Sequence, residues 1–209
     1  MIRKFVLGSY GVNLYVVYDE IEKKAAIVDP AIYDSKVVKF IDGLNLKVEY
    51  IILTHGHGDH LLGIDKYKEK YKCEITAHKS EKELLSNGDL NFSKRMSGES
   101  ITIIPDKWLK EDDMISIGGI DLKVIHTPGH TKGGICLLND DFLISGDTLF
   151  YSSIGRHDLY GGNYEILMQS IIKKLMKLDD DLIVYPGHGS ETTIGFERNN
   201  NPFIKKEMK

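Results

Sequence analysis

The chain has 209 residues, of which 42% are hydrophobic and 28% are charged. These values are typical of a globular protein with one domain, residues 1–209, and they exclude a disordered or collagen-like chain. The 27 basic and 31 acidic residues give a formal net charge of −4. That balance excludes the overall basic charge that is typical of nucleic-acid-binding proteins.

Other features of the whole sequence predict a cytoplasmic protein. The apolar runs are too short to span a bilayer. The first residues have neither the apolar stretch nor the small-residue cleavage site of a secretory signal. The two cysteines, Cys73 and Cys136, form no CxxC pair and no disulfide framework. We therefore expect no membrane partner.

In the first half of the chain, apolar runs predict strands with helices between them. Strands around Phe5 and Leu14 flank a glycine-rich turn, and 25–28 and 48–53 are short apolar runs typical of buried strands. Helices are expected after Asp34, from about 61 to 71, and over 80–85. The segment 86–107 is rich in Asn, Ser and Gly, and we expect a long loop there, with short helical turns at most.

The second half predicts four strands, one long helix and a last strand. The strands are 114–117, 120–126, 134–138 and 142–145, with turns at Gly118-Gly119 and Asn139-Asp140-Asp141. A helix is expected from about 164 to 178, then a strand over 182–185, a turn and a polar tail. Because strands come in runs with helices interspersed, the pattern favours two packed sheets or one mixed sheet covered by helices.

The strongest functional motif directly follows the strand that ends at Leu53. Residues 54–60 read THGHGDH and place four side chains of metal-ligand type within six residues: His55, His57, Asp59 and His60. Imidazole and carboxylate suit zinc and iron better than calcium or magnesium. In an extended loop, His55 and His57 point the same way. The segment therefore predicts a metal site.

Three later segments have the same build, an apolar strand followed by a turn with one ligand-type residue. Each such residue comes directly after a glycine: His130, Asp147 and His188. Strand ends are where a rigid scaffold places a functional site. The resulting seven ligands are too many for one zinc ion and suit two ions with a bridging carboxylate.

These motifs resemble the metallo-β-lactamase superfamily, and in particular its glyoxalase II-like branch. The resemblance rests on THGHGDH, on TPGHT at 127–131, on SGDTLF at 145–150 and on PGHG at 186–189. The short bacterial members, which have no C-terminal glutathione-binding helical domain, are most similar through GRHDL at 155–159 and TIGFER at 193–198. The resemblance implies an α/β fold of the αββα four-layer sandwich type.

The resemblance also implies the roles of individual residues. One metal is expected on His55, His57 and His130, and a second on Asp59, His60 and His188, with Asp147 bridging the two. The two divalent ions are expected to be zinc, with iron and manganese as alternatives. Asp59 is also the expected catalytic residue that orients the nucleophile. Arg156, with His157 beside it, is expected to bind the substrate, while a surface pairing of Arg156 with Asp158 is the alternative.

The expected function is hydrolysis of a thioester or ester of a small molecule, similar to that of hydroxyacylglutathione hydrolases. Two alternatives use the same scaffold: a persulfide dioxygenase with one iron ion, and a lactonase. A non-enzymatic metal-binding module is a further alternative. The aspartate at 147, where true β-lactamases of this superfamily commonly have a cysteine, argues against a β-lactam substrate. His126 is expected outside the ligand set, and His78 is given no role.

Overall fold

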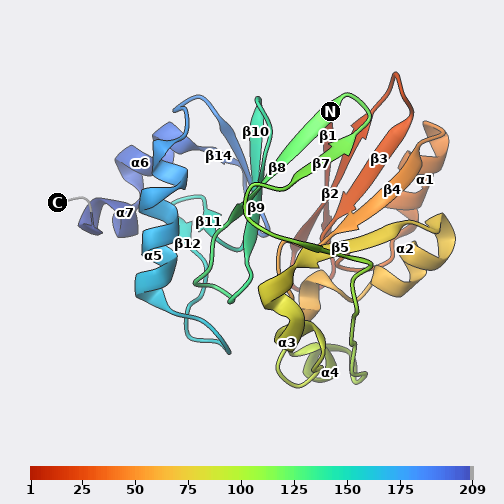
Figure 1. Cartoon of the computed structure of the whole chain (residues 1–209), viewed down its shortest axis with the longest axis horizontal. Helices are drawn as coiled ribbons and strands as arrows, with labels where there is room; N and C mark the ends of the chain where they lie inside the picture. Colours follow the sequence, from red (N-terminus) through yellow and green to blue (C-terminus); the bar gives the residue numbers. More distant parts are fainter. Residues whose placement is uncertain (208–209) are drawn as a thin grey trace.

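Two six-stranded β-sheets form the centre of the molecule (Figure 1). The structure is a computed structural model, and it describes residues 1–207. In the first sheet, β1 to β3 are antiparallel, and β3 to β6 are parallel to one another. Its strands are β1 (Ile2–Leu7), β2 (Val12–Asp19), β3 (Lys24–Val28), β4 (Lys47–Ile52), β5 (Glu74–His78) and β6 (Lys107–Leu109), in that order.

The second sheet contains the strands of the C-terminal half. Only β10 and β13 run parallel, and the other neighbours are antiparallel. Its order is β14 (Thr192–Thr193), β13 (Ile183–Pro186), β10 (Phe142–Gly146), β9 (Ile135–Leu138), β8 (Ile120–His126) and β7 (Met114–Ile117). A small hairpin of β11 (Leu149–Phe150) and β12 (Ser153–Ile154) follows β10.

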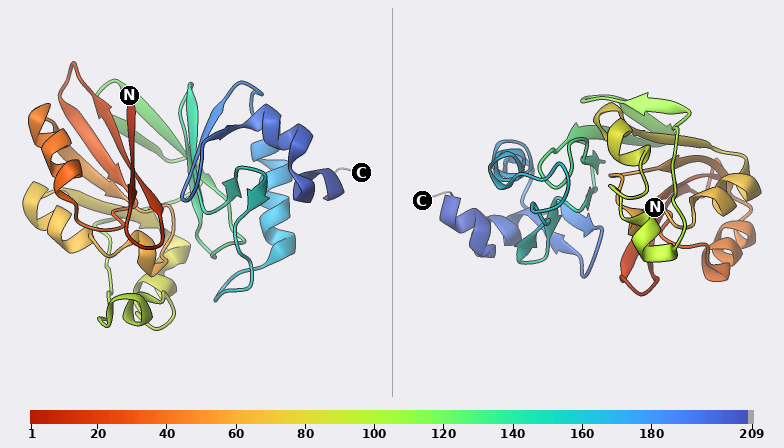
Figure 2. Two further views of the ribbon diagram at one scale, coloured as in Figure 1. Left: turned by 180° about the vertical axis from the view of Figure 1, so that it is seen from behind. Right: turned by 90° about the horizontal axis from the view of Figure 1, so that it is seen from below.

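The two sheets pack face to face through apolar side chains. Val17 and Val28 of the first sheet share one buried cluster with Val124 and Leu137 of the second. Burial of such a shared face is the main driving force that holds two sheets together. Figure 2 shows from two further sides that the helices lie outside this pair of sheets.

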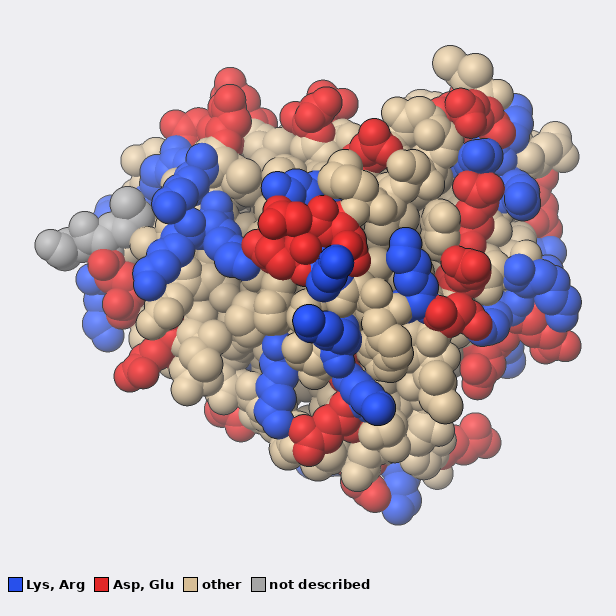
Figure 3. Space-filling model, viewed as in Figure 1, with Lys and Arg blue, Asp and Glu red and all other residues tan. Residues whose placement is uncertain are grey.

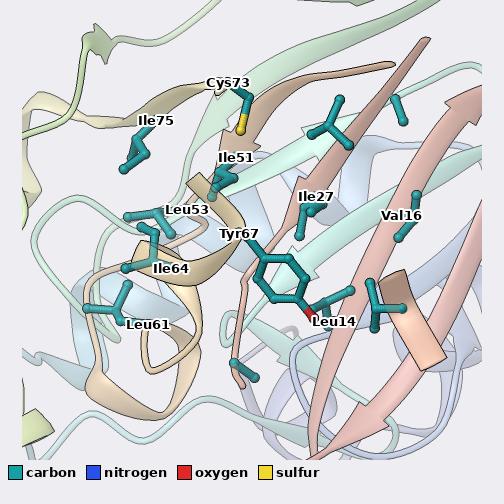
Figure 4. Close-up of a cluster of buried hydrophobic side chains, with 14 of the residues drawn as sticks. Leu14, Val16, Ile27, Ile51, Leu53, Leu61, Ile64, Tyr67, Cys73 and Ile75 are labelled. Atoms are coloured by element: carbon teal, nitrogen blue, oxygen red, sulfur yellow. The ribbon is translucent and has the colours of Figure 1, made fainter. Parts of the chain in front are cut away.

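Helices cover the outer face of each sheet. Tyr67 of α2 (Ile64–Tyr71) packs with Leu14 and Ile51 of the first sheet (Figure 4). Val37 and Ile41 of α1 (Ser35–Gly43) belong to the same buried cluster. The second sheet is covered by α5 (Tyr164–Lys173), α6 (Ile194–Asn200) and α7 (Pro202–Glu207). The predicted single-domain αββα sandwich is therefore confirmed.

Several boundaries differ from the sequence prediction. The helix expected from 61 begins at Ile64, because residues 58–60 form a 3₁₀ turn. The helix expected to reach 178 ends at Lys173 and continues as a 3₁₀ turn over Leu175–Lys177. The helix expected over 80–85 is the short α3 (Lys82–Leu85). Segment 86–107 is mostly loop, as expected, and contains the short α4 (Ser93–Ser97).

The prediction of a polar tail after residue 185 was wrong. The segment forms β14, α6 and α7. Its polar residues are internally paired, since buried Glu197 accepts hydrogen bonds from Ser152 N, Thr192 Oγ1 and Asn201 Nδ2. Thr193 caps α6 by accepting a hydrogen bond from Phe196 N. These long-range partners stabilise helices that the local composition does not indicate.

The surface carries both signs of charge. Basic and acidic side chains are interspersed over the face seen in Figure 3. Within residues 1–207, no helix combines the length and the apolarity that crossing a membrane would require.

Candidate metal centre

Three buried histidines form the first group of candidate ligands. His55 and His57 follow β4, and His130 follows β8. A ligand-type nitrogen from each lies within 4.8 Å of those of the other two. His57 Nδ1 and His130 Nε2 are 2.9 Å apart. Three imidazoles that converge in this way offer the nitrogen ligands of a zinc-type site.

The second group combines the 3₁₀ turn Gly58–His60 with the end of β13. Ligand atoms of Asp59, His60 and His188 also lie within 4.8 Å of one another. His188 Nε2 is 3.2 Å from His60 Nε2 and 3.3 Å from Asp59 Oδ2. This group therefore contains a carboxylate, which the first group does not.

Asp147 lies between the two groups. Its Oδ2 atom is 3.5 Å from His130 Nε2 of the first group and 3.6 Å from His188 Nε2 of the second. Its Oδ1 atom is 3.5 Å from His60 Nε2. The structure thus brings together all seven residues that the sequence singled out as ligands, with the one shared carboxylate in the middle.

Unpaired polar atoms show that this donor set fits a metal ion. His55 Nε2 and Asp147 Oδ1 are buried and have no hydrogen-bond partner among residues 1–207. An unsatisfied buried polar atom is costly, and each one in a native structure requires an explanation. Bound divalent cations would satisfy these atoms, since imidazole and carboxylate are ligands that zinc and iron prefer.

Hydrogen bonds to the outer nitrogens hold three of the imidazole rings in place. His130 Nδ1 lies 2.6 Å from Arg156 O, and His188 Nδ1 lies 3.1 Å from Tyr10 O. His60 Nδ1 lies 3.0 Å from a carboxylate oxygen of Asp29. Such bonds place the proton on Nδ1 and leave Nε2 as the ligand atom.

Asp29 also lies in this centre, with ligand atoms near those of His55 and His60, and sequence analysis did not single it out. It is buried, and its carboxylate accepts hydrogen bonds from both the backbone N and the hydroxyl of Thr54, in addition to its contact with His60. Its backbone is left-handed, with φ +52°. In the sequence it is simply the residue that follows the apolar run 25–28. The signal was present, because Asp29 follows an apolar strand as the predicted ligands do.

Glu81 is a second residue that was missed. It is buried, and its Oε1 atom accepts a 2.6 Å hydrogen bond from Gly133 N, three residues after His130. A Cβ atom on Gly56 would lie 2.7 Å from Glu81 Oε2. The carboxylate therefore packs between the two loops that carry the first group of histidines. Burial raises its pKa.

The electrostatics of the two groups differ. Burial lowers the pKa of His57 to about 3 and holds that of His55 well below its ordinary value. For His60, burial is outweighed by Asp147, Asp59 and Asp29, which raise its pKa to about 10. The histidines of the first group are therefore neutral, with lone pairs available for a cation, while those of the second group lie next to carboxylates.

The two predicted substrate-binding residues lie at the surface. Arg156 makes two hydrogen bonds to Asp158, at 3.0 and 2.9 Å, and both side chains are about two-thirds exposed. His157 is exposed, and its ring packs against Tyr164. Arg156 thus adopts the surface pairing that we considered as the alternative, although its carbonyl group orients His130.

The remaining histidines are not among the candidate ligands. His78 and His126 stack on each other with ring centroids 3.9 Å apart. His126 Nε2 lies 3.0 Å from Lys132 O. The position of His126 outside the ligand set agrees with the sequence interpretation.

Comparisons with known proteins identify the family. The model of the metallo-beta-lactamase superfamily matches residues 7–188. Hydroxyacylglutathione hydrolase GloC of Haemophilus influenzae is 35% identical over 93% of both chains. The crystal structure of BLEG-1 B3 metallo-beta-lactamase is 36% identical, with a TM-score of 0.90 over 98% of this chain and 99% of that chain.

A third relative contains metal. The crystal structure of TTHA1623 in a di-iron-bound form is 29% identical, with a TM-score of 0.83 over 96% of this chain and 99% of that chain. The fold and the His and Asp groups imply that this chain binds divalent metal. By its fold and sequence, the chain belongs to the metallo-beta-lactamase superfamily and is a hydrolase of that superfamily.

Proposed function

We propose that the chain hydrolyses a thioester or ester of a small molecule, with a hydroxyacylglutathione-type compound as the model substrate. The observation that carries the proposal is the position of Asp147, within 3.6 Å of imidazoles from both ligand groups. The similarity to GloC, whose name describes a hydroxyacylglutathione hydrolase, supports the substrate class.

In this proposal the site holds two divalent ions, for which zinc is our first choice and iron the second. His55, His57 and His130 would hold one ion, Asp59, His60 and His188 would hold the other, and Asp147 would be shared between them. Two bound ions would lower the pKa of water towards neutrality and polarise a carbonyl group. The similarity to a di-iron-bound structure supports two ions and keeps iron in consideration.

The residues of the chain contribute position and orientation. We propose Asp59 as the catalytic residue. It supplies the carboxylate of the second group, and this half-buried carboxylate can accept a hydrogen bond from the attacking water. Attack on the carbonyl carbon breaks the bond to sulfur or oxygen, and the leaving group takes up a proton. Arg156 and His157 would bind a substrate carboxylate once Arg156 exchanges its partner Asp158. A cytoplasmic location, a small-molecule substrate and no nucleic-acid or membrane partner stay predictions from the sequence.

β-Lactam hydrolysis is the second candidate function. It is favoured by the 36% identity to BLEG-1 B3 metallo-beta-lactamase, although Asp147 led us to expect another substrate. Persulfide oxidation and lactone hydrolysis are the alternatives that use the same ligands.

The test combines Asp147→Ala with metal counting on the purified protein. We expect the wild type to hold about two ions per chain and the variant one or fewer, with thioester hydrolysis reduced at least 100-fold. A panel of a thioester, a lactone, a β-lactam and a persulfide separates the functions. If the variant keeps both its metal and its activity, Asp147 does not bridge. One iron per chain with oxygen uptake on the persulfide would identify a dioxygenase instead.

A further inference from the structure

Phe92 adopts a backbone conformation that its residue type disfavours. Seven residues other than glycine have positive φ within residues 1–207: Lys23, Asp29, Asn45, Lys72, Phe92, Asp112 and Ser152. Six are polar or charged, and Phe92, at φ +65°, is the one apolar residue of the set. A bulky residue in the left-handed region is an outlier, and such strain persists only where the surroundings impose it.

The surroundings that impose this conformation include the loop 54–60, which carries four of the candidate ligands. Gly58 N donates a 2.6 Å hydrogen bond to Asn91 O, and a Cβ atom on Gly58 would lie 2.6 Å from Ser93 N. Buried Asn91 accepts a hydrogen bond from Ser93 N and donates one to Ile101 O. The residues on both sides of Phe92 are therefore fixed against the turn between His57 and Asp59.

Packing of the Phe92 side chain in the hydrophobic core does not compensate for this strain. Phe92 is half-buried, and within residues 1–207 it is not one of the half-buried apolar residues that pack on the three core clusters. Its aromatic neighbour is His57, with ring centroids 6.1 Å apart. A strained backbone thus places an apolar ring next to a candidate metal ligand.

We propose that Phe92 is a specificity-determining residue, which forms an apolar wall beside His57 and favours substrates with an apolar acyl group. The inference rests on the proposed thioester hydrolysis. Because the ring lies 6.1 Å from that of a candidate ligand, the proposal places it beside the groups next to the scissile carbonyl. Contact with the ring lowers KM for a substrate whose acyl group is apolar. It leaves KM unchanged for a substrate whose acyl group is polar and stays hydrated.

The test compares thioesters that share one thiol and differ in the acyl group, for example hexanoyl against lactoyl. Phe92→Ala and Phe92→Gly are expected to raise KM about 10-fold for the apolar acyl group. KM for the polar acyl group and the metal content are expected to stay within about two-fold of wild type, since both variants keep every proposed ligand. Equal changes in KM for both acyl groups, or unchanged KM for both, would overturn the proposal.

Thermal stability gives a readout that does not depend on activity. Phe92→Gly should keep the Tm of the metal-bound protein within about 3 °C of wild type, because relief of the left-handed conformation offsets the lost side chain. A fall of about 10 °C, as expected for truncation of a core aromatic residue, would show that the ring is a packing residue and overturn the proposal.

Lys72→Gly is the matched control. Lys72 is exposed, has φ +54° and is the C-cap residue that follows α2, so this variant relieves the same kind of strain elsewhere. It should change neither KM value. Absence of thioester hydrolysis by the wild type would refute the proposed function, whereas hydrolysis with unaltered acyl preference in the Phe92 variants would refute only the role of Phe92.

Discussion

Gly187, the residue before His188, shows how closely the centre is packed at the scale of single residues. A Cβ atom there would overlap Asp147 Oδ1 and lie 3.0 Å from His60 Cε1. Gly187→Ala must therefore displace the shared carboxylate. We expect at least a 10-fold loss of hydrolysis and fewer bound metal ions, as measured by kinetics and metal analysis.

Gly43→Ala provides the control for this prediction. Gly43 is the last residue of α1, and a Cβ atom there meets no other atom within 4 Å. The metal content of Gly43→Ala should equal that of wild type. Its free energy of unfolding should be the same or higher by up to about 1 kcal/mol. If Gly187→Ala also retained its metal, the centre would have more room than the distances indicate.

Sequence reasoning singled out the residues that local spacing marks as candidate ligands, and the structure places them close together. His55, His57, Asp59 and His60 occur within six residues, and His130, Asp147 and His188 each follow a glycine at a strand end. Asp29 and Glu81 escaped because their roles depend on partners far along the chain: Thr54 and His60 for Asp29, and Gly133 for Glu81. Glu81 has no local pattern that distinguishes it from a solvated carboxylate, whereas Asp29 shares the strand-end position of the predicted ligands.

At the scale of elements, the stacked pair of His78 and His126 connects the two sheets. His78 ends β5 of the first sheet and His126 ends β8 of the second. Burial and the neighbouring imidazole lower the pKa of His78 to about 4, and burial lowers that of His126. Lys79 lowers the pKa of His78 further, while Glu111 opposes the effect.

This stack predicts a pH dependence of stability. The unfolded chain binds a proton at His78 near pH 6.5, whereas the folded protein resists protonation down to about pH 4. Stability from this group is therefore complete above pH 6.5 and is lost as the pH falls towards 4, by about 2–3 kcal/mol. Urea unfolding of wild type and His78→Phe at pH 7, 6 and 5 measures the difference.

The His78→Phe variant keeps an aromatic ring against His126 and removes the titrating group. Its stability should fall less steeply between pH 7 and pH 5 than that of wild type. Loss of the hydrogen bond from Ser80 N to His78 Nδ1 lowers the stability of the variant equally at each pH. Parallel pH curves for the two proteins would contradict the lowered pKa of His78.

Strand positions were more predictable than helix ends. Short apolar runs bounded by turns located β3, β4, β8 and β10 to within a few residues. The end of α5 and the existence of α6 and α7 were not predictable, because they depend on tertiary contacts. Arg198, for example, donates hydrogen bonds to Met176 O and Leu178 O across the turn that follows α5.

At the scale of the whole molecule, the candidate ligands come from both sheets. His55, His57, Asp59 and His60 follow β4 of the first sheet, whereas His130, Asp147 and His188 follow β8, β10 and β13 of the second. Each proposed ion therefore has ligands from both halves of the sandwich. Ions that bind this arrangement and not the unfolded chain must stabilise the folded protein.

Removal of metal is the corresponding prediction. At a free metal concentration 1,000 times the Kd, binding at one site contributes about 4 kcal/mol to the free energy of unfolding. Dialysis against a chelator should then lower Tm by about 8–16 °C, and readdition of zinc should restore it. Calorimetry measures both changes. A Tm that does not respond to the chelator would show that the ions do not link the two sheets.

Because each ligand set comes from both sheets, residues far from the centre also influence its geometry. The distance between His57 and His130, and that between His60 and His188, is fixed by how the two sheets dock through Val28, Val124 and their neighbours. Protein cores transmit strain because they are close-packed. The affinity for metal therefore depends on the packing between the sheets. A substitution in that apolar interface changes the distances between the ligands of the reactive centre.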